Sequence, residues 1–287
     1  MNFEIESPLN KEELLKTLSN LQSKKFRFGA GFTDLLIEFK KFNPVETTVI
    51  NLAQLKDEEF CSIRNDSGEI QIGSLVKLAQ ICKDTYIKDN FPVLHQAANA
   101  LASGQIREVA TVGGNICQAS PSGDLSCALV SLKANCEILN IDGKIRNQAI
   151  SEFFKGPGKT SLQKNEILKS ISIPINHSKN LKSGYIKIGK RSAMECSIVS
   201  LAYHFQLEKN GKVKHAGIAI GAVGPTIIFC QETVDFLLKQ NINNIDEVLK
   251  LKIASMIQNA SSPIDDARAS AWYRHQVLYN VAKSLFE

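Results

Sequence analysis

The sequence predicts an α+β fold: two α/β units, followed by a C-terminal region in which a three-stranded antiparallel sheet packs against helices. Strand and helix patterns alternate along residues 1–57 and again along 58–176. Beyond residue 180, three segments alternate apolar and polar residues around a strong hairpin signal, Asn210-Gly211, and helical patterns follow. With 287 residues, 44% of them apolar, the chain is long enough for more than one hydrophobic core.

The first unit has the order strand, helix, strand. Phe3 and Ile5 alternate with acids, Asn10 is placed to cap a helix, and Glu13 occupies the reciprocal capping position. FRFGAGFTDLL (26–36) predicts a short strand, a glycine turn and a helix opening near Thr33 or Asp34, and TTVINLAQL (47–55) predicts another strand. The first helix is predicted from an apolar stripe at helical spacing, formed by Leu14, Leu15, Leu18 and Leu21.

The second unit contains the longest stretch with few apolar anchors. EIQIGSLVKLAQIC (69–82) predicts a strand and then a helix capped by Ser74, and FPVLHQAANALAS (91–103) predicts a helix. Residues 103–124, rich in glycine and serine, predict a long loop of the kind that is usually functional inside a compact domain. LSCALVSLKAN (125–135) then predicts a buried helix, and CEILNIDGKIRNQAI (136–150) a hairpin that turns at Asp142-Gly143.

The C-terminal region begins after a predicted linker over residues 176–183. We expect strands over 184–191, 197–207 and 214–223, and helices over 232–240, 245–258 and 269–286. This pattern divides the chain into domains at 1–176, with subdomains of about 1–57 and 58–176, and at 180–287.

Composition excludes several classes of protein. The sequence has no apolar run long enough to span a membrane, and its N-terminus lacks the basic and apolar blocks of a signal peptide, so a cytoplasmic location is expected. The formal charge of +5 is spread along the chain, whereas a nucleic-acid groove needs a concentrated basic stripe with aromatics. The five histidines show no metal spacing.

The cysteines are predicted to be buried free thiols. There are seven, none in a CxxC pair, and most lie within apolar runs. Cys117, Cys127 and Cys136 are the closest group, but zinc and iron–sulfur ligands usually stand two to four residues apart.

Two glycine-bearing loops carry the chemical signal. A diphosphate is bound well by backbone N–H groups only where the chain approaches closely, and glycine permits that approach. Phe28–Leu35 and Thr111–Asn115 meet this requirement, but neither fits GxGxxG or a P-loop, so a Rossmann site is not supported. Taken alone, each loop is more often a plain turn.

At this point the sequence resembles a known family, the FAD-binding (medium) subunits of molybdenum hydroxylases, especially those of the xanthine dehydrogenase type. The middle segment is the most specific, because the pattern QIRxxATxGGNIxxASPxGD belongs to little else. Seven segments carry the resemblance in order: GAGFTDLL (29–36), IQIGSLVKLAQI (70–81), LASGQIREVATVGGNICQASPSGD (101–124), EILKSISIP (166–174), KIGKRSAMECSIVSLA (187–202), GAVGPT (221–226) and SSPIDDARASAWYR (261–274).

The resemblance implies a fold and a set of cofactor contacts. The fold would be the two-subdomain FAD-binding fold shared with vanillyl-alcohol oxidase (the PCMH type), followed by a C-terminal domain like that of the carbon monoxide dehydrogenase flavoprotein. Both loops would lie against the pyrophosphate of FAD, Asp124 near the ribityl chain, and Leu168 and Lys187 near the isoalloxazine ring. The implied cofactor-binding residues are Phe28, Gly29, Ala30, Gly31, Phe32, Thr33, Asp34, Leu35, Leu101, Thr111, Val112, Gly113, Gly114, Asn115, Asp124, Leu168 and Lys187.

Each carried residue also has a purely structural alternative. Asp124 could cap the helix beginning at Leu125, Lys187 could be a solvent-facing edge lysine, and Leu168 could be core. Arg107 and Arg191 could pair with phosphate or with carboxylates, and ion pairs are the favoured expectation. The sequence departs from the family at Gly31-Phe32, where many relatives have Gly-Gly, and at Glu195, where Asp is usual. The four-cysteine insertion that holds a [4Fe–4S] cluster in some relatives is missing.

The implied function is electron transfer. A large partner subunit would hold molybdopterin and hydroxylate a substrate, xanthine or a related purine. A small partner subunit with [2Fe–2S] clusters would pass electrons to FAD on this chain, and NAD or another acceptor would receive them. No general base, nucleophile or metal site is demanded here. The alternatives are a medium subunit of another hydroxylase such as carbon monoxide dehydrogenase, a self-contained flavin reductase of the same fold, an adaptor without FAD, and a nucleic-acid binder.

Overall fold

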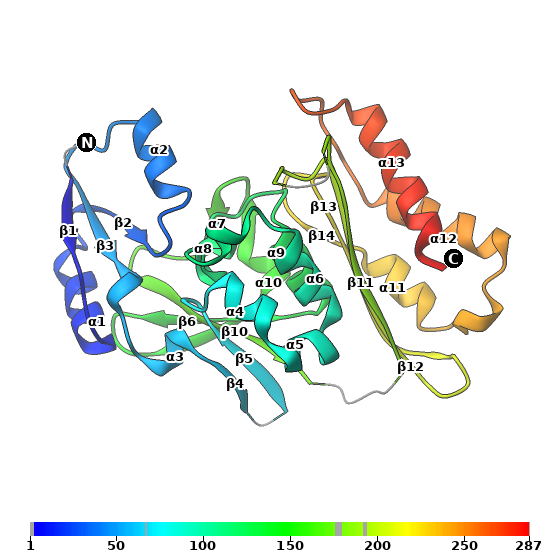
Figure 1. Ribbon diagram of the computed structural model, residues 1–287, viewed down its shortest axis with the longest axis horizontal. Helices are drawn as coiled ribbons and strands as arrows, with labels where there is room; N and C mark the ends of the chain where they lie inside the picture. The colour runs from blue at the N-terminus through cyan, green and yellow to red at the C-terminus, as the bar shows by residue number, and fades with distance from the viewer. Residues whose placement is uncertain (1–2, 67, 176–179, 192–193, 287) are drawn as a thin grey trace.

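The protein is built around three larger sheets that follow one another along its longest axis, and in the described residues β8 and β9 form a further two-stranded sheet (Figure 1). The computed structural model describes residues 3–66, 68–175, 180–191 and 194–286. A three-stranded sheet carries the N-terminal part, a five-stranded sheet the middle and a four-stranded sheet the C-terminal part. The predicted α+β class, with an appended antiparallel sheet and helices, is confirmed.

The first sheet is parallel, with the order β1-β3-β2, as its βαβ sequence pattern requires. Asn10 caps the first helix by accepting a hydrogen bond from the N–H of Glu13 at 2.9 Å, and the Glu13 carboxylate accepts from the N–H of Leu9 at 2.8 Å. The predicted cap is therefore confirmed, with the reciprocal bond displaced by one residue. The elements are β1 (Glu4–Glu6), α1 (Lys11–Asn20), β2 (Lys25–Gly29), α2 (Leu35–Lys41), β3 (Thr47–Asn51) and η1 (Leu52–Gln54).

The second sheet is antiparallel, with the order β4-β5-β10-β6-β7. Its central strand β10 is buried from Glu166 to Ile173. The elements are α3 (Glu58–Cys61), β4 (Ile63–Asp66), β5 (Glu69–Gly73), α4 (Leu78–Lys83), α5 (Thr85–Asn90), α6 (Pro92–Ala100), α7 (Gly104–Arg107), α8 (Val112–Cys117), α9 (Asp124–Ser131), β6 (Asn135–Asn140), β7 (Ile145–Ala149), α10 (Ile150–Phe153), β8 (Phe154–Gly156), β9 (Lys159–Thr160) and β10 (Glu166–Pro174).

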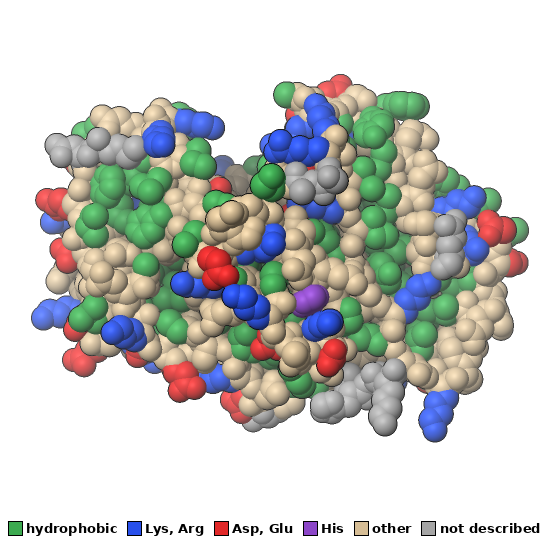
Figure 2. All heavy atoms as spheres, viewed as in Figure 1, with side chains coloured by type: hydrophobic (Ala, Val, Ile, Leu, Met, Phe, Trp, Pro, Cys, Tyr) green, Lys and Arg blue, Asp and Glu red, His purple; other side chains and the backbone are tan. Residues whose placement is uncertain are grey.

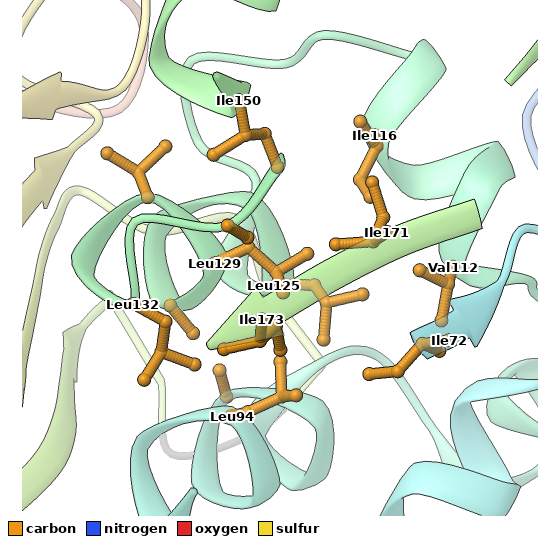
Figure 3. Packing of buried hydrophobic residues seen from close by; sticks show 14 of the residues in the cluster. Ile72, Leu94, Val112, Ile116, Leu125, Leu129, Leu132, Ile150, Ile171 and Ile173 are labelled. Carbon is orange, nitrogen blue, oxygen red and sulfur yellow. The ribbon is translucent and has the colours of Figure 1, made fainter. Parts of the chain in front are cut away.

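The main core lies between this sheet and the helices on one of its faces. Ile171 and Ile173 of β10 point toward residues from α6, α8 and α9, including Leu94, Ile116 and Leu125 (Figure 3). The opposite face of the same sheet contributes Leu139 and Ile167 to a smaller core that α1 closes. The sheet is thus covered on both sides, which fixes the N-terminal unit against the middle of the molecule.

Two predictions for the second unit are wrong in detail. The helix after β5 is capped by Lys77 rather than Ser74, because residues 74–78 first bond to the segment 110–113. Residues 103–124 are not one long loop. They contain α7, capped by Ser103, and α8, capped by Thr111, because each hydroxyl side chain accepts from a backbone N–H three residues on.

The third sheet is antiparallel, with the order β11-β12-β13-β14. Alternate residues of β12 face opposite cores: Ala202 belongs to the main core beneath α6 and α9, and Leu201 to the core under the C-terminal helices. The elements are β11 (Leu181–Ile188), β12 (Val199–Leu207), β13 (Val213–Gly221), β14 (Ile228–Phe229), α11 (Gln231–Leu237), η2 (Ile242–Asn244), α12 (Glu247–Asn259), α13 (Ala271–Lys283) and η3 (Ser284–Phe286).

The predicted hairpin turn of the third sheet is confirmed, whereas the predicted strand number is not. Gly211 has φ +87°, and the N–H of Glu208 donates to the carbonyl of Lys212. A fourth strand, β14, joins the three expected ones; it has only two residues, too few for an alternating pattern. Residues 181–183 of the expected linker lie in β11, and 176–179 are outside the described residues. The division into domains at 176–180 therefore stays a prediction.

Candidate functional site

A cavity of about 690 Å³ lies where the three parts of the chain meet. Figure 2 shows the molecule hollowed at its upper edge, between the lobe that carries α2 and the lobe that carries α13. The cavity is lined by the segment that leads into α2, by residues between α6 and α9, by β10 and by the segment before β12. Its size lies within the range of small-molecule and cofactor sites.

Most of the residues predicted to bind a cofactor line this cavity. Gly29, Val112 and Lys187 do not line it. Those that do are Phe28, Ala30, Gly31, Phe32, Thr33, Asp34, Leu35, Leu101, Thr111, Gly113, Gly114, Asn115, Asp124 and Leu168. Residues far apart in the sequence are therefore brought to one place.

The first loop, residues 28–35, offers unused backbone donors. It runs from the end of β2 into α2, and its helix receives no side-chain cap from Asp34. Within the described part of the chain, the N–H groups of Gly31, Phe32, Thr33 and Asp34 donate to no backbone acceptor. Consecutive N–H groups without a backbone acceptor beside a cavity form a suitable site for an anion such as phosphate.

Phe32 has an uncommon backbone conformation for its type. Its φ is +59°, in the left-handed region that favours glycine. The Phe32 ring occupies the space above Gly29, where an added Cβ would lie 2.4 Å from the ring. Gly29 is thus needed to seat Phe32, and this explains its place in the motif although it does not line the cavity.

The two loops are packed against each other. A Cβ added to Gly31 would lie 2.2 Å from the carbonyl oxygen of Val109, two residues before the second loop. A Cβ on Gly113 would lie 2.8 Å from the carbonyl oxygen of Ser74. Both glycines are therefore required by contacts between protein segments, independently of any ligand.

In the second loop, residues 111–115, the backbone donors from Val112 to Asn115 are already bonded within the protein, contrary to the reasoning that pointed to this loop. The N–H of Val112 donates to Val76 and that of Gly113 to Ser74, at 2.9 and 2.7 Å. The N–H groups of Gly114 and Asn115 donate to Thr111, at 3.0 Å each. These amides bond within the start of α8, so the loop offers a ligand its shape, the Thr111 hydroxyl and the Asn115 side chain. In the described part of the chain, Asn115 Oδ1 is buried with no hydrogen-bond partner.

Asp124 is held by side chains from the C-terminal region. It is the first residue of α9, is 6% exposed and lines the cavity. Its Oδ1 accepts from the Tyr185 hydroxyl at 2.6 Å and from the Ser197 hydroxyl at 2.8 Å, and its Oδ2 lies 2.6 Å from Lys187 Nζ. It makes no capping bond to α9, so the capping alternative is wrong.

Lys187 is neither a solvent-facing edge lysine nor a residue of the cavity wall. Its side chain is 14% exposed, and its Nζ donates to Asp124 and to the carbonyl of Ala100, at 2.6 and 3.1 Å. It therefore pairs with an acid of the cavity wall without lining the cavity itself. Leu168, on β10, lines the cavity and is also core, at 2% exposed.

The two expected arginine ion pairs differ in outcome. Arg107 bonds backbone instead of an acid: its guanidinium donates to the carbonyls of Asn99, Leu101 and Ala102, at 3.1, 2.8 and 3.1 Å. It thereby closes the turn after α6, next to the cavity. Arg191 does pair with Glu195, at 3.9 Å.

The segment before β12 adds residues that sequence reasoning did not place in the site. Met194, Glu195 and Cys196 line the cavity, and Glu195 Oε1 is buried with no hydrogen-bond partner among the described residues. Their spacing carries no signal of its own, because they reach the cavity only through the docking of the third sheet. Cys117 also lines it, and burial raises the pKa of this thiol to about 12.

Among the described residues, no group of three or more His, Cys, Asp or Glu side chains is placed to hold a metal ion. In the same part of the chain, each helix is too short or too polar to cross a lipid bilayer.

Comparison with known proteins identifies the family to which the chain belongs. Residues 1–176 match the FAD binding domain in molybdopterin dehydrogenase, and residues 184–287 match the CO dehydrogenase flavoprotein C-terminal domain. The chain belongs to the FAD-binding, or medium, subunits of the molybdenum hydroxylases.

Individual relatives indicate which kinds of molybdenum hydroxylase the chain is most similar to. The chain is 30% identical to the xanthine dehydrogenase FAD-binding subunit of Escherichia coli O157:H7, covering 89% of this chain and 86% of that one. It is 27% identical to the nicotinate dehydrogenase FAD-subunit of Eubacterium barkeri, covering 99% and 95%. In three dimensions it matches a chain of carbon monoxide dehydrogenase from Hydrogenophaga pseudoflava with a TM-score of 0.90 at 23% identity, covering 99% and 96%.

Proposed function

We propose that this chain binds FAD in the cavity and relays electrons within a molybdenum hydroxylase of the xanthine dehydrogenase type. It would receive them from iron–sulfur clusters on a partner subunit and pass them to an acceptor. The observation that carries the proposal is the row of unused N–H groups from Gly31 to Asp34 beside the cavity, on a chain of the FAD-binding family. FAD supplies the redox chemistry, whereas the protein sets its position and access.

The first loop is the proposed diphosphate site. Its N–H groups from Gly31 to Asp34 have no backbone acceptor in the described part of the chain, whereas those from Val112 to Asn115 in the second loop are bonded within the protein. The second loop would shape the opposite side and offer the side chains of Thr111 and Asn115. Gly114 leaves room for a ligand there, because a Cβ at this position would meet only Thr111 Oγ1, at 3.0 Å, within 4 Å.

The flavin end of the cofactor is proposed to lie toward Asp124 and Leu168. These two residues line the cavity on the side where the second sheet and the C-terminal region meet. Leu168 offers an apolar contact to a ring, and the Asp124 carboxylate offers an acceptor to hydroxyl or N–H groups. Lys187 is proposed to influence this end through Asp124, since its ammonium is bonded there.

The partners are proposed from the relatives. A large subunit would hold molybdopterin and hydroxylate the substrate, and a small subunit would hold [2Fe–2S] clusters. Xanthine or a related purine is the proposed substrate, because a relative at 30% identity is named a xanthine dehydrogenase subunit. The nicotinate dehydrogenase relative, at 27%, makes another N-heterocycle the second candidate. NAD is the proposed acceptor.

Gly114 gives the cleanest test of the site. In Gly114→Leu the added Cβ would meet no backbone of another segment, and Gly114 lines the cavity, so we expect the fold to persist while FAD affinity falls at least about tenfold. Gly113→Leu is a poorer test, because its Cβ would collide with Ser74 and unfold the region. Binding is measured by flavin fluorescence titration, and stability by thermal unfolding.

Gly104→Leu is the matched control. Gly104 does not line the cavity, and a Cβ there would meet nothing within 4 Å. This variant should bind FAD as the unchanged protein does. If Gly114→Leu also binds FAD with unchanged affinity, the cavity is not the cofactor site. Copurification with molybdopterin and iron–sulfur subunits tests the relay, and a chain that purifies with neither partner would contradict it.

A further inference from the structure

The carboxylate of Asp124 uses both of its oxygens on the C-terminal region. Oδ1 accepts from Tyr185 and Ser197, and Oδ2 is paired with Lys187. Tyr185 and Lys187 stand on β11, and Ser197 stands just before β12. Asp124, in the cavity wall, is therefore positioned by side chains from two other segments, which lie 61 to 73 residues further along the sequence.

Tyr185 is fixed at both its backbone and its side chain. Its N–H donates to Gln96 Oε1, on α6, at 2.8 Å, and its hydroxyl donates to Asp124 at 2.6 Å. Burial, and then the negative charge of Asp124, raise the pKa of the phenol well above its usual value. The phenol is thus a neutral donor at any working pH, and removing its hydroxyl takes one donor from Asp124 without changing the charge of the protein.

Lys187 balances the charge of Asp124 without lining the cavity itself. Its ammonium lies between Asp124 Oδ2 and the carbonyl of Ala100, which precedes the cavity residue Leu101. A ligand in the cavity therefore contacts Asp124, whose charge is balanced by Lys187. Lys187 is not itself among the residues that line the cavity. Lys187 can therefore affect a bound ligand only through the Asp124 carboxylate or through the electric field of its own ammonium group.

We propose that Tyr185 and Lys187 are positioning residues for the flavin site, and that Tyr185 acts on the bound flavin only through the Asp124 carboxylate. Tyr185 aims the carboxylate, and Lys187 sets how much negative charge it presents to the cavity. This inference rests on the proposed binding of FAD. It adds Tyr185 to the residues that govern the flavin, although the Tyr185 side chain does not line the cavity.

A double-mutant cycle on the full chain tests the inference. The variants are Tyr185→Phe, Asp124→Asn and the two combined, and FAD dissociation constants and flavin midpoint potentials are measured for each. Tyr185→Phe should weaken FAD binding about tenfold, since a hydrogen bond to a charged group is lost, and should lower the potential because Asp124 is less well compensated. In the Asp124→Asn background the same change should have little further effect.

Lys187 supplies the charge test. Lys187→Met should lower the flavin potential, because an uncompensated carboxylate disfavours the negative charge of reduced flavin, and Lys187→Arg should restore most of it.

Tyr203→Phe is the matched control for Tyr185→Phe. Tyr203 stands on the neighbouring strand, is partly exposed, and among the described residues its hydroxyl makes no hydrogen bond. It should leave both measurements unchanged.

The outcomes separate this inference from the proposed function. If the unchanged protein binds no FAD, both are wrong. The inference alone is overturned if the protein binds FAD but the effects of Tyr185→Phe and Asp124→Asn on affinity and potential are additive. It is also overturned if Tyr185→Phe changes neither quantity. Should Tyr185→Phe lower the unfolding temperature enough to lose the fold, Ser197→Ala replaces it in the cycle, because Ser197 bonds the same oxygen at 2.8 Å.

Discussion

Gly31 shows at the scale of one residue how the cavity is built. The close approach of its Cα to the Val109 carbonyl joins the first loop to the chain that enters the second. The sequence identified this glycine for a different reason, the approach of a diphosphate. Its neighbours in space are some 80 residues away in the chain, so its packing role was invisible in the sequence, whereas the residue type was predicted correctly.

Substitution of Gly31 should therefore affect stability as well as binding. In Gly31→Ala the new methyl would lie 2.2 Å from the Val109 oxygen, which forces the loops apart at a cost of about 1–3 kcal/mol. Urea unfolding of the FAD-free protein measures this cost directly. Gly104→Ala, with open space around its Cβ, should cost nothing. Equal midpoints for the two variants would show that the loops are not in contact.

At the same scale, the partners of Asp124 mark a limit of sequence reasoning. The acid and Lys187 were both connected to the flavin by family resemblance. Their bond to each other, and the roles of Tyr185 and Ser197, depend on the docking of β11 against α9, which no local pattern encodes. Lys187 was expected beside the ring, which stays a prediction; the structure shows it bonded to the acid and absent from the cavity lining.

At the scale of elements, the contact between α9 and β13 holds the third sheet to the rest of the molecule. A Cβ added to Gly217, on β13, would lie 1.8 Å from the carbonyl oxygen of Ser131, at the end of α9. The same helix begins at Asp124, in the cavity wall. The backbone of β13 thus packs directly against the end of α9. At the start of α9, Asp124 bonds to side chains of β11.

Gly217→Ala tests whether this contact supports the site. The methyl would separate β13 from α9, so we expect a loss of about 1–3 kcal/mol in the free energy of unfolding, together with weaker FAD binding. Chemical unfolding and fluorescence titration measure the two effects. A variant with full stability and full affinity would show that the sheet does not rest on α9 at this point.

Elements with strong local patterns were predicted well. Alternation located the strands of the third sheet, and leucine spacing located α1. The failures share a cause: the start of α4 depends on bonds from residues 74–78 to 110–113, and the two-residue β14 exists only by pairing with β13. Such features are set by tertiary contacts rather than by the residues themselves.

At the scale of the whole molecule, His204 connects stability to pH. This residue of β12 is 8% exposed, stacks on Phe91 of the middle unit, and has its Nδ1 3.1 Å from the Ser183 hydroxyl. Burial, and then the charge of His215, lower its pKa from 6.5 to about 4. The folded protein therefore keeps His204 neutral at pH values where the unfolded chain binds a proton.

The protein should consequently lose stability in a defined acid window. Because the folded pKa lies below the unfolded one, the contribution of His204 is complete above pH 6.5 and is lost as the pH falls toward 4, by about 2–3 kcal/mol. His204→Gln should flatten the dependence of unfolding free energy on pH in this window. A slope in His204→Gln equal to that of the unchanged protein would refute the assignment.

The bonds from Asp124 to β11 also bear on how such subunits are recombined. A chimera that joins residues 1–175 of this chain to the C-terminal region of a relative inherits one half of the Asp124 contacts from each parent. If the donor lacks a phenol and an ammonium at the positions of Tyr185 and Lys187, a buried acid is left with too few donors. Domain exchange in this family is therefore a question of matching side chains across the junction, and the position of the cut matters less.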